Sequence, residues 1–332
     1  MTSTLVTTRC PAKVNLTFQI VGLLPDGYHE VKTLMQAVSL EDELAFQFSP
    51  GSGQVTFSSV DSSFESSFPV DDSNLIVKAI RKFQNRVPSS SSENIDIRIK
   101  KRIPIGAGLA GGSSNAAAAL VALNHRCGNT LSPEEVTAIG AALGADVPFC
   151  LMGATAIGVN RGDVLAAVDC KTEFTLLLAK PRKLSISTPW AFKEFDKLVL
   201  EKRDEASTVS DTTERCAAAI VTGTAPCIAP YLVNDLEEPV FHHFEELNKI
   251  RCKLEDFGAL RARLTGSGPT LYGLFESAHD AENAKIMLDE FQTAQAQAVS
   301  PGSINKTASS SESIYPLDSW VVQSVQLGAR VV

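Results

Sequence analysis

The sequence predicts an α+β fold, because strand and helix patterns mix along the chain without the regular strand–helix–strand repeat of a doubly wound sheet. Alternating apolar residues predict strands over residues 12–21 and 95–99. Apolar residues at helical spacing predict a helix over residues 74–86. A glycine-rich loop, residues 104–114, lies between the second of these strands and an alanine-rich helix, residues 115–124.

The 332 residues are enough for one large or two medium domains. Near residue 175 the glycine-rich loops give way to a new pattern of strands and helices. We therefore expect domains over residues 1–175 and 176–332.

The other elements follow from local patterns. Residues 22–27 have the Pro-Asp-Gly chemistry of a turn, and Ser132-Pro133-Glu134-Glu135 has the cap, proline and acids of a helix start running to about Leu143. The alanine-rich helix is apolar nearly all round and should be buried. We expect further strands at residues 44–48, 174–179, 262–264, 270–275 and 320–327, edge strand and loop at 49–67, helices at 189–203, 240–257 and 279–295, and disorder at 301–313.

Composition excludes several classes of protein. The formal net charge of −8 disfavours binding to nucleic acid or to an anionic membrane. The seven cysteines are widely spaced without a C-x-x-C motif, so we expect reduced thiols and neither a zinc site nor a disulfide framework. No apolar run is long enough to span a bilayer. The start, MTSTLVTTR, fits a frayed terminus or the tail of an organelle transit peptide.

The glycine-rich loop has the chemistry of an anion cradle. Its glycines let backbone N–H groups converge on one ligand, and the helix behind it directs its positive end to the same place. The loop lacks the order of a Walker A motif, and no acid follows at the spacing of a dinucleotide site. The predicted nucleotide-binding residues are Pro104, Ile105, Gly106, Ala107, Gly108, Leu109, Ala110, Gly111, Gly112, Ser113 and Ser114.

Three further segments carry candidate site residues. Lys13 and Asn15 share one face of the first strand, although strand lysines are common at solvated edges. Asp146 follows a helix-ending glycine, where an aspartate is often a turn or cap residue. A tight turn containing Gly266, Ser267 and Gly268 is also a common hairpin feature.

In combination these segments resemble the GHMP kinases. PIGAGLAGGSSNAAAAL is similar to the phosphate loop of that family, and LTGSGPT is similar to its C-terminal glycine motif. The segments CPAKVNLTFQIVG, DGYHEVKTLMQAVSL, GADVPF, NRGD, STPWAF and NDLE resemble the branch that acts on a cytidine diphosphate-linked methylerythritol. The likeness covers nearly the whole chain and is weakest at residues 49–67 and 301–313.

The resemblance implies a ribosomal protein S5 domain 2-like N-terminal domain, a ferredoxin-like α/β sandwich after it, and a cleft between them. It implies that ATP, with Mg²⁺, phosphorylates the 2-hydroxyl of the methylerythritol in the non-mevalonate isoprenoid pathway. Asp146 would be the base and Lys13 would polarise the hydroxyl. The implied substrate contacts are Asn15, Tyr28, His29, Thr188 and Phe192, with Tyr28 and Phe192 around the cytosine and His29 at its edge. Lys100 or Lys101 would approach the nucleotide.

Two positions depart from the family pattern: Ala110 replaces a glycine and Asp163 a more usual glutamate. A methyl group at Ala110 is tolerated where φ is negative and damaging where it is positive. A kinase for mevalonate-type substrates or homoserine is disfavoured by Tyr28 and His29, and a non-catalytic ligand sensor by the presence of Lys13 and Asp146. The expected partner is a small molecule, in a bacterial cytoplasm or a plastid-type stroma, while the oligomeric state and the protein ligand of the metal are left open.

Overall fold

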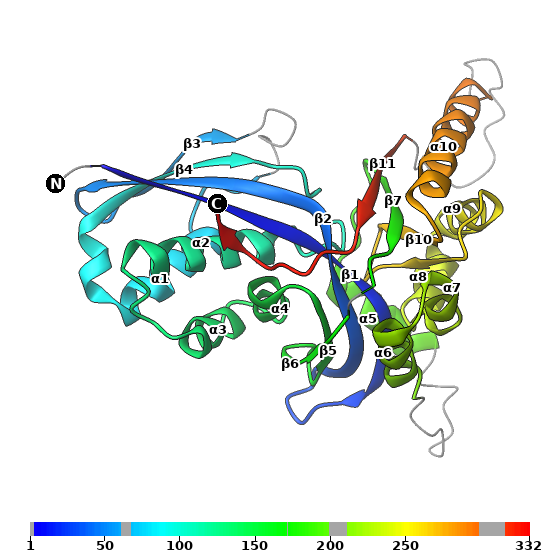
Figure 1. Ribbon diagram of the computed structural model, residues 1–332, viewed down its shortest axis with the longest axis horizontal. Coiled ribbons are helices and arrows are strands. Elements are labelled where there is room, and N and C mark those ends of the chain that lie inside the picture. Colours follow the sequence, from blue (N-terminus) through cyan, green and yellow to red (C-terminus); the bar gives the residue numbers. More distant parts are fainter. Residues whose placement is uncertain (1–2, 61–67, 171, 199–210, 299–315) are drawn as a thin grey trace.

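The computed structural model describes residues 3–60, 68–170, 172–198, 211–298 and 316–332 of the chain (Figure 1). Two β-sheets carry helices in a mixed order, which confirms the α+β class. In Figure 1, helices α1 to α4 lie on one face of the first sheet, and α9 and α10 lie beside the second.

The first sheet has eight strands in the described residues, with the order β12-β1-β2-β4-β3. Outside this path, β5 pairs with β2 and β6, and β8 pairs with β1. The strands are β1 (Thr4–Leu23), β2 (His29–Pro50), β3 (Val55–Val60), β4 (Glu93–Lys100), β5 (Thr155–Val159), β6 (Val164–Val168), β8 (Val233–Asn234) and β12 (Arg330–Val331).

The long hairpin of β1 and β2 forms the centre of this sheet. Both of its strands are longer than the sequence pattern predicts. Its turn is at the expected place, where Gly27 has a φ of 84°. The pairing register shifts between Asn15 and Thr17, and such a bulge re-aims the side chains beside it. Lys13 and Asn15 are both buried on one face of β1, so they are not residues of a solvated edge.

The helices of the first half are α1 (Leu75–Arg86), α2 (Gly111–Arg126), α3 (Pro133–Ala141) and α4 (Val147–Met152), with a 3-10 turn at Pro88–Ser92. Helix α3 has the predicted start, since Ser132 and Glu135 form a reciprocal capping box. Helix α2 is buried as predicted but begins earlier, because the Ser114 amide already donates to the Ala110 carbonyl at 2.9 Å. The two serines of the loop therefore belong to the first turn of α2.

The second sheet has four strands in the described residues, in the antiparallel order β11-β7-β10-β9. These strands are β7 (Thr175–Pro181), β9 (Arg261–Leu264), β10 (Leu271–Phe275) and β11 (Leu317–Gln323). The helices of this half are α5 (Thr188–Leu198), α6 (Thr212–Thr222), α7 (Ala225–Ile228), α8 (Glu237–His243), α9 (Glu245–Asp256) and α10 (Ala278–Ala298), with a 3-10 turn at Ala229–Tyr231.

Several elements differ from the prediction. The helix expected over residues 240–257 is two helices, because Phe244 leaves the helical conformation with a ψ of 70°. No element was predicted at α4, β5, β6, α6, α7 or the short strands β8 and β12. The segments expected at 61–67, 199–203 and 301–313 lie outside the described residues.

The hydrophobic core joins the two halves of the chain. One cluster of buried side chains contains Val14 and Leu16 from β1 together with Leu176 from β7 and Tyr272 from β10. Strands β8 and β12 also return to the first sheet after the expected boundary. The division at residue 175 stays a prediction. None of the helices in the described ranges combines the length and apolarity that a membrane span requires.

Candidate active site

A cavity of about 870 Å³ collects most of the predicted site residues. It is bordered by β1, the glycine-rich loop, the starts of α2, α4 and α5, and the second glycine turn. The predicted residues that line it are Lys13, Asn15, Tyr28, His29, Pro104, Ile105, Gly106, Ala107, Gly108, Ala110, Gly111, Gly112, Ser113, Asp146, Thr188, Phe192, Gly266 and Ser267.

Three predicted residues do not line the cavity. Ser114 is fully buried and donates its hydroxyl to the Pro11 carbonyl at 2.7 Å. Leu109 packs into the hydrophobic core that joins the sheets. Gly268 lies against the Gly108 backbone. These three residues anchor the two glycine loops to the rest of the protein. The sequence motifs alone do not show whether a residue anchors a loop or contacts a ligand.

The first glycine loop has a backbone that requires glycine at particular points. Gly106 and Gly108 have φ angles of 63° and 77°. A Cβ on Gly108 would lie 2.6 Å from the Thr265 carbonyl oxygen, so this close approach to the second loop is open to glycine only. The loop leads into α2, whose first-turn residues Gly111 and Gly112 face the cavity. Free N–H groups and the positive helix end therefore point into the cavity.

Ala110 occupies the cap position of α2 with a φ of 58°. A methyl group is tolerated at this position only where φ is negative, and the φ of Ala110 is positive. A non-glycine residue in this left-handed region costs on the order of 1–2 kcal/mol. Ala110 is therefore a strained departure from glycine at the mouth of the phosphate cradle.

Lys13 and Asp146 form the charged centre of the cavity. The Lys13 Nζ lies 3.7 Å from the Asp146 Oδ1 and donates to the Asn15 Oδ1 at 2.7 Å. The Lys13 side chain is 6% exposed and that of Asp146 is 40% exposed, so the ammonium group is held inside while the carboxylate faces the opening. Asp146 precedes α4 but makes no side-chain cap hydrogen bond, which leaves its oxygens for other partners.

Asn15 orients this lysine. Its Nδ2 donates to the Thr33 hydroxyl at 2.8 Å while its Oδ1 accepts from Lys13, so the amide group is held at both ends. Its backbone N–H donates to the Thr265 hydroxyl at 3.0 Å. Asn15 thus connects β1 to both the hairpin partner and the second glycine turn.

The second glycine turn closes the cavity beside the lysine. A Cβ on Gly266 would lie 3.3 Å from the Asn15 Oδ1 and 3.7 Å from the Lys13 Nζ. The hydroxyl groups of Ser267 and Thr188 are 3.0 Å apart. Helix α5 and the turn therefore meet at the same wall.

The aromatic end of the cavity is arranged differently from the expected cytosine sandwich. The His29 ring stacks on Phe192, with centroids 4.5 Å apart and planes at 20°. The Arg161 guanidinium lies 4.0 Å from the centroid of the exposed Tyr28 ring and pairs with Asp26. Tyr28 and Phe192 border the same cavity, but each ring has its own side-chain neighbour.

Two residues here were not predicted as site residues. Arg161 belongs to the NRGD segment. This segment contributes to the family resemblance, but no role was predicted for its arginine. The Asp196 Oδ1 lies 2.7 Å from the His29 Nε2. Asp196 is four residues after Phe192 on α5, which places both side chains on one face of the helix. This spacing is the sequence feature from which Asp196 could have been predicted as a site residue.

The two lysines before the loop lie in different surroundings. Lys100 is exposed and lies 3.3 Å from the Glu43 carboxylate. Lys101 is buried, pairs with Asp42 and lines the cavity. A Cβ on Gly111 would lie 3.0 Å from the Lys101 Nζ, so this ammonium group borders the start of α2.

Carboxylates that line the cavity are few. Among the described lining residues they are Asp146 and Asp163, and the Asp163 Oδ1 already accepts from Asn160 and from the Arg161 amide. Within the described residues, no cluster of three His, Cys, Asp or Glu side chains has the arrangement of a metal site. A divalent cation here would take most of its ligands from phosphates and water, as Mg²⁺ commonly does.

Comparisons with known proteins agree with this geometry. Residues 74–154 match the family model of the GHMP kinases N terminal domain, and residues 216–292 match that of the GHMP kinases C terminal. The chain is 38% identical to the 4-diphosphocytidyl-2-C-methyl-D-erythritol kinase of Acaryochloris marina over 87% of this chain and 92% of that protein. It is 37% identical to the protein of the same name from Synechococcus elongatus, over 82% and 87% of the two chains.

Solved structures give the same picture. A crystal structure of 4-(cytidine 5'-diphospho)-2C-methyl-D-erythritol kinase superposes with a TM-score of 0.69 and 26% identity, covering 98% of this chain and 100% of that one. Mevalonate kinase of L. major has the same TM-score at 15% identity over 98% of each chain, which shows a shared fold. The chain therefore belongs to the GHMP kinases and, among them, to the family of the 4-diphosphocytidyl-2-C-methyl-D-erythritol kinases.

Proposed function

We propose that this chain transfers the γ-phosphoryl group of ATP to the 2-hydroxyl of 4-diphosphocytidyl-2-C-methyl-D-erythritol, giving the 2-phosphate and ADP in the non-mevalonate route to isoprenoid precursors. The observation that carries the proposal is the 3.7 Å approach of Lys13 to Asp146 beside a glycine-rich helix start, in one cavity with His29 and Phe192. The names of the relatives supply the substrate.

Different residues carry out proton acceptance, charge stabilisation and phosphate binding. Asp146 accepts the proton of the 2-hydroxyl, whose oxygen forms a bond to the γ-phosphorus while the bond from that phosphorus to the β–γ bridging oxygen breaks. ADP leaves with the electrons of that bond. Lys13 stabilises the negative charge that develops on the attacking oxygen, and Asn15 holds Lys13 in place. The N–H groups of the loop and of α2 bind the phosphates.

A Mg²⁺ ion bound with the nucleotide would neutralise part of the phosphate charge. Among the described residues that line the cavity, Asp146 is a carboxylate that makes no side-chain cap hydrogen bond, and it would be the protein ligand of this ion. Lys101 supplies a further positive charge at the edge of the phosphate cradle.

The cytidine end is recognised by the aromatic residues. Phe192 and Tyr28 offer flat apolar faces to a base, and His29 and Arg161 offer polar edges around it. Because Arg161 lies on Tyr28 and His29 lies on Phe192, these polar groups are within reach of a base that stacks on either ring.

The test is an ADP-release assay with Mg-ATP and the cytidylyl substrate, using the wild type, Asp146→Asn and the control Asp256→Asn, an exposed residue on α9. We expect turnover by the wild type and the control, and a loss of about 10²- to 10⁴-fold in kcat for Asp146→Asn, as for removal of a general base. A wild type that binds ATP and the cytidine ligand without turnover would instead be a sensor. Turnover of a mevalonate derivative alone would overturn the substrate assignment.

A further inference from the structure

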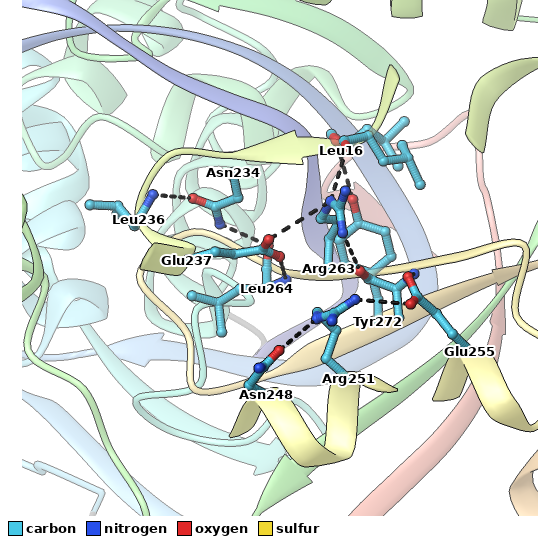
Figure 2. A network of polar contacts seen from close by, with 12 residues as sticks. Leu16, Asn234, Leu236, Glu237, Asn248, Arg251, Glu255, Arg263, Leu264 and Tyr272 are labelled. Atoms are coloured by element: carbon cyan, nitrogen blue, oxygen red, sulfur yellow. Dashed lines mark hydrogen bonds and ion pairs between the residues drawn. The ribbon is translucent and has the colours of Figure 1, made fainter. Parts of the chain in front are cut away.

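The second glycine turn is held by the side chain of Asn234, which Figure 2 shows beside Leu264. Asn234 is buried at the end of β8, which pairs in parallel with β1 so that Asn234 lies opposite Phe18. Its Nδ2 donates to the carbonyl oxygens of Leu264 and Gly266, each at 2.8 Å, and its Oδ1 accepts from the Leu236 amide at 2.9 Å. One amide group thus pins two carbonyls that lie two residues apart in the turn.

Glu237 supplies a second anchor at the start of α8. Its Oε1 accepts from the Leu264 amide at 2.7 Å. Its Oε2 lies 3.8 Å from the Nε of Arg263, which donates to the Leu232 carbonyl at 2.9 Å. Leu264 is therefore fixed through its carbonyl by Asn234 and through its N–H by Glu237, as the dashed lines of Figure 2 show.

The other side of the same turn faces the charged centre of the cavity. The Thr265 hydroxyl accepts from the Asn15 amide at 3.0 Å, and Gly266 packs against the Asn15 and Lys13 side chains. Gly266 has a φ of 57°, a left-handed conformation that is open to glycine without strain and that many other backbone conformations of glycine compete with. A displacement of the turn would change the space beside the Lys13 ammonium group directly.

We propose that Asn234 is a positioning residue for phosphoryl transfer: it sets the shape of the 264–268 turn against Lys13 and Asn15, with Glu237 as its second anchor. The inference rests on the proposed function. Asn234 acts through the turn, since it does not line the cavity itself. A shift of about 1 Å in a group that positions reacting atoms costs on the order of 100-fold in rate, so removal of Asn234 lowers kcat even in a folded protein.

A purely structural role makes a different prediction. Loss of two buried hydrogen bonds lowers the stability of the fold whether or not the turn matters for catalysis. The two roles separate when kcat and KM are measured well below the unfolding temperature, because a merely destabilised protein is still fully folded there.

The experiment compares four variants with the wild type. Asn234→Asp keeps the shape of the side chain but turns an oxygen toward two carbonyl oxygens, and Asn234→Ala removes the group. Glu237→Gln keeps an acceptor for the Leu264 amide, whereas Glu237→Ala does not. Asn248→Ala is the control, because Asn248 is an exposed amide of the neighbouring helix that bonds to Arg251 and does not contact the turn. For each we measure the thermal midpoint, kcat and the KM of both substrates.

We expect both Asn234 variants to lose about 10- to 100-fold in kcat with KM values within about threefold of the wild type. Glu237→Ala should also lose kcat, with Glu237→Gln close to the wild type, and the control unchanged.

Folded Asn234 variants with wild-type kcat and only a lower thermal midpoint would overturn the inference. If the Asn234 variants do not fold, the comparison of Glu237→Gln with Glu237→Ala takes their place. A higher kcat in Glu237→Gln than in Glu237→Ala supports the inference, and equal kcat values in the two variants overturn it. An inactive wild type is a separate outcome, which overturns the proposed function and the inference with it.

Discussion

Lys101 and Asp42 form an ion pair whose side chains are 2% and 0% exposed. The Asp42 carboxylate also accepts from the Arg102 and Ile103 amides, at 2.7 and 2.9 Å, and from the Asn115 Nδ2 at 2.7 Å. A single buried carboxylate therefore holds the lysine, the entry to the glycine loop and helix α2 together.

Replacing this carboxylate should cost much of the stability of the protein. Asp42→Asn leaves the Lys101 charge buried without a partner, and removal of one member of a buried pair typically costs about 3–5 kcal/mol. We expect a loss of that size in the free energy of unfolding, measured with urea. The control is Glu43→Gln, which breaks exposed pairs with Arg9 and Lys100 and should cost less than about 1 kcal/mol. Equal losses in the two variants would contradict the prediction.

The strained cap of α2 predicts a stabilising substitution. In Ala110→Gly the left-handed backbone loses its penalty of about 1–2 kcal/mol, and the greater freedom of glycine in the unfolded chain takes back about 0.5–1 kcal/mol. The free energy of unfolding should rise by up to about 1.5 kcal/mol. Ala118→Gly, in the ordinary part of the same helix, should lower it by about 1 kcal/mol or more. A loss in both variants would show that the cap conformation is not strained.

The bond between Asp196 and His29 predicts a specific effect on cytidine binding. Asp196→Ala frees the His29 ring from its partner at 2.7 Å and should weaken the binding of CDP about tenfold, or ~1.4 kcal/mol, in titration calorimetry. Asp196→Asn retains an acceptor and should lose less. ADP binding should not change, because Asp196 lies outside the glycine loop. Glu194→Gln on the same helix is the control, and an equal effect on ADP and CDP would argue against a role in base recognition.

The cysteines predict a graded reactivity. Hydrogen bonds with the backbone and hydroxyl of Thr224 lower the pKa of the exposed Cys227 thiol below its ordinary value. Burial raises the pKa of Cys10 and of Cys216 to about 12. Because the thiolate reacts, alkylation of Cys227 should begin below the pH that is usual for a free thiol, and the buried thiols of Cys10 and Cys216 should stay unmodified in the folded protein. Peptide mass spectrometry after brief iodoacetamide treatment between about pH 6.5 and 8.5 measures this order.

Modification of Cys10 or Cys216 before Cys227 would refute that order. Cys227→Ser is the control, since it should remove the early alkylation and leave the rest of the pattern unchanged.

Much of the fold was predictable because its signals are local. The alternation in β4, the capping box of α3 and the apolar circumference of α2 each depend on a few neighbouring residues. The strands β8 and β12 have two residues each and exist only because β1 offers a free edge, so no local pattern predicts them. The break at Phe244 has a similar tertiary origin, since that ring packs on Trp190 of α5 with centroids 5.5 Å apart.

The candidate site divides in the same way. Motif spacing predicted residues that line the cavity, such as Lys13 and Asp146, but it did not predict the roles of Thr265 and Asn234 in holding the second glycine turn. Both are far from Asn15 in sequence: Thr265 bonds to the Asn15 backbone, and Asn234 holds the turn that contains Thr265 through the pairing of β8 with β1. Nor did the motif reveal that Ser114 points away from the cavity, because its orientation follows from the helix starting at Gly111.

The strand that carries Lys13 and Asn15 is also the meeting point of distant parts of the chain. Besides β2, it pairs with β8 and with β12, where Thr8 lies opposite Val331. Because a chain is synthesised from its N-terminus, β1 leaves the ribosome before its partners β8 and β12 have been made. The strand that carries Lys13 is therefore paired on both sides only after Val331 has been made. A nascent or prematurely terminated chain would present an open strand edge instead of a working site, and such edges favour aggregation.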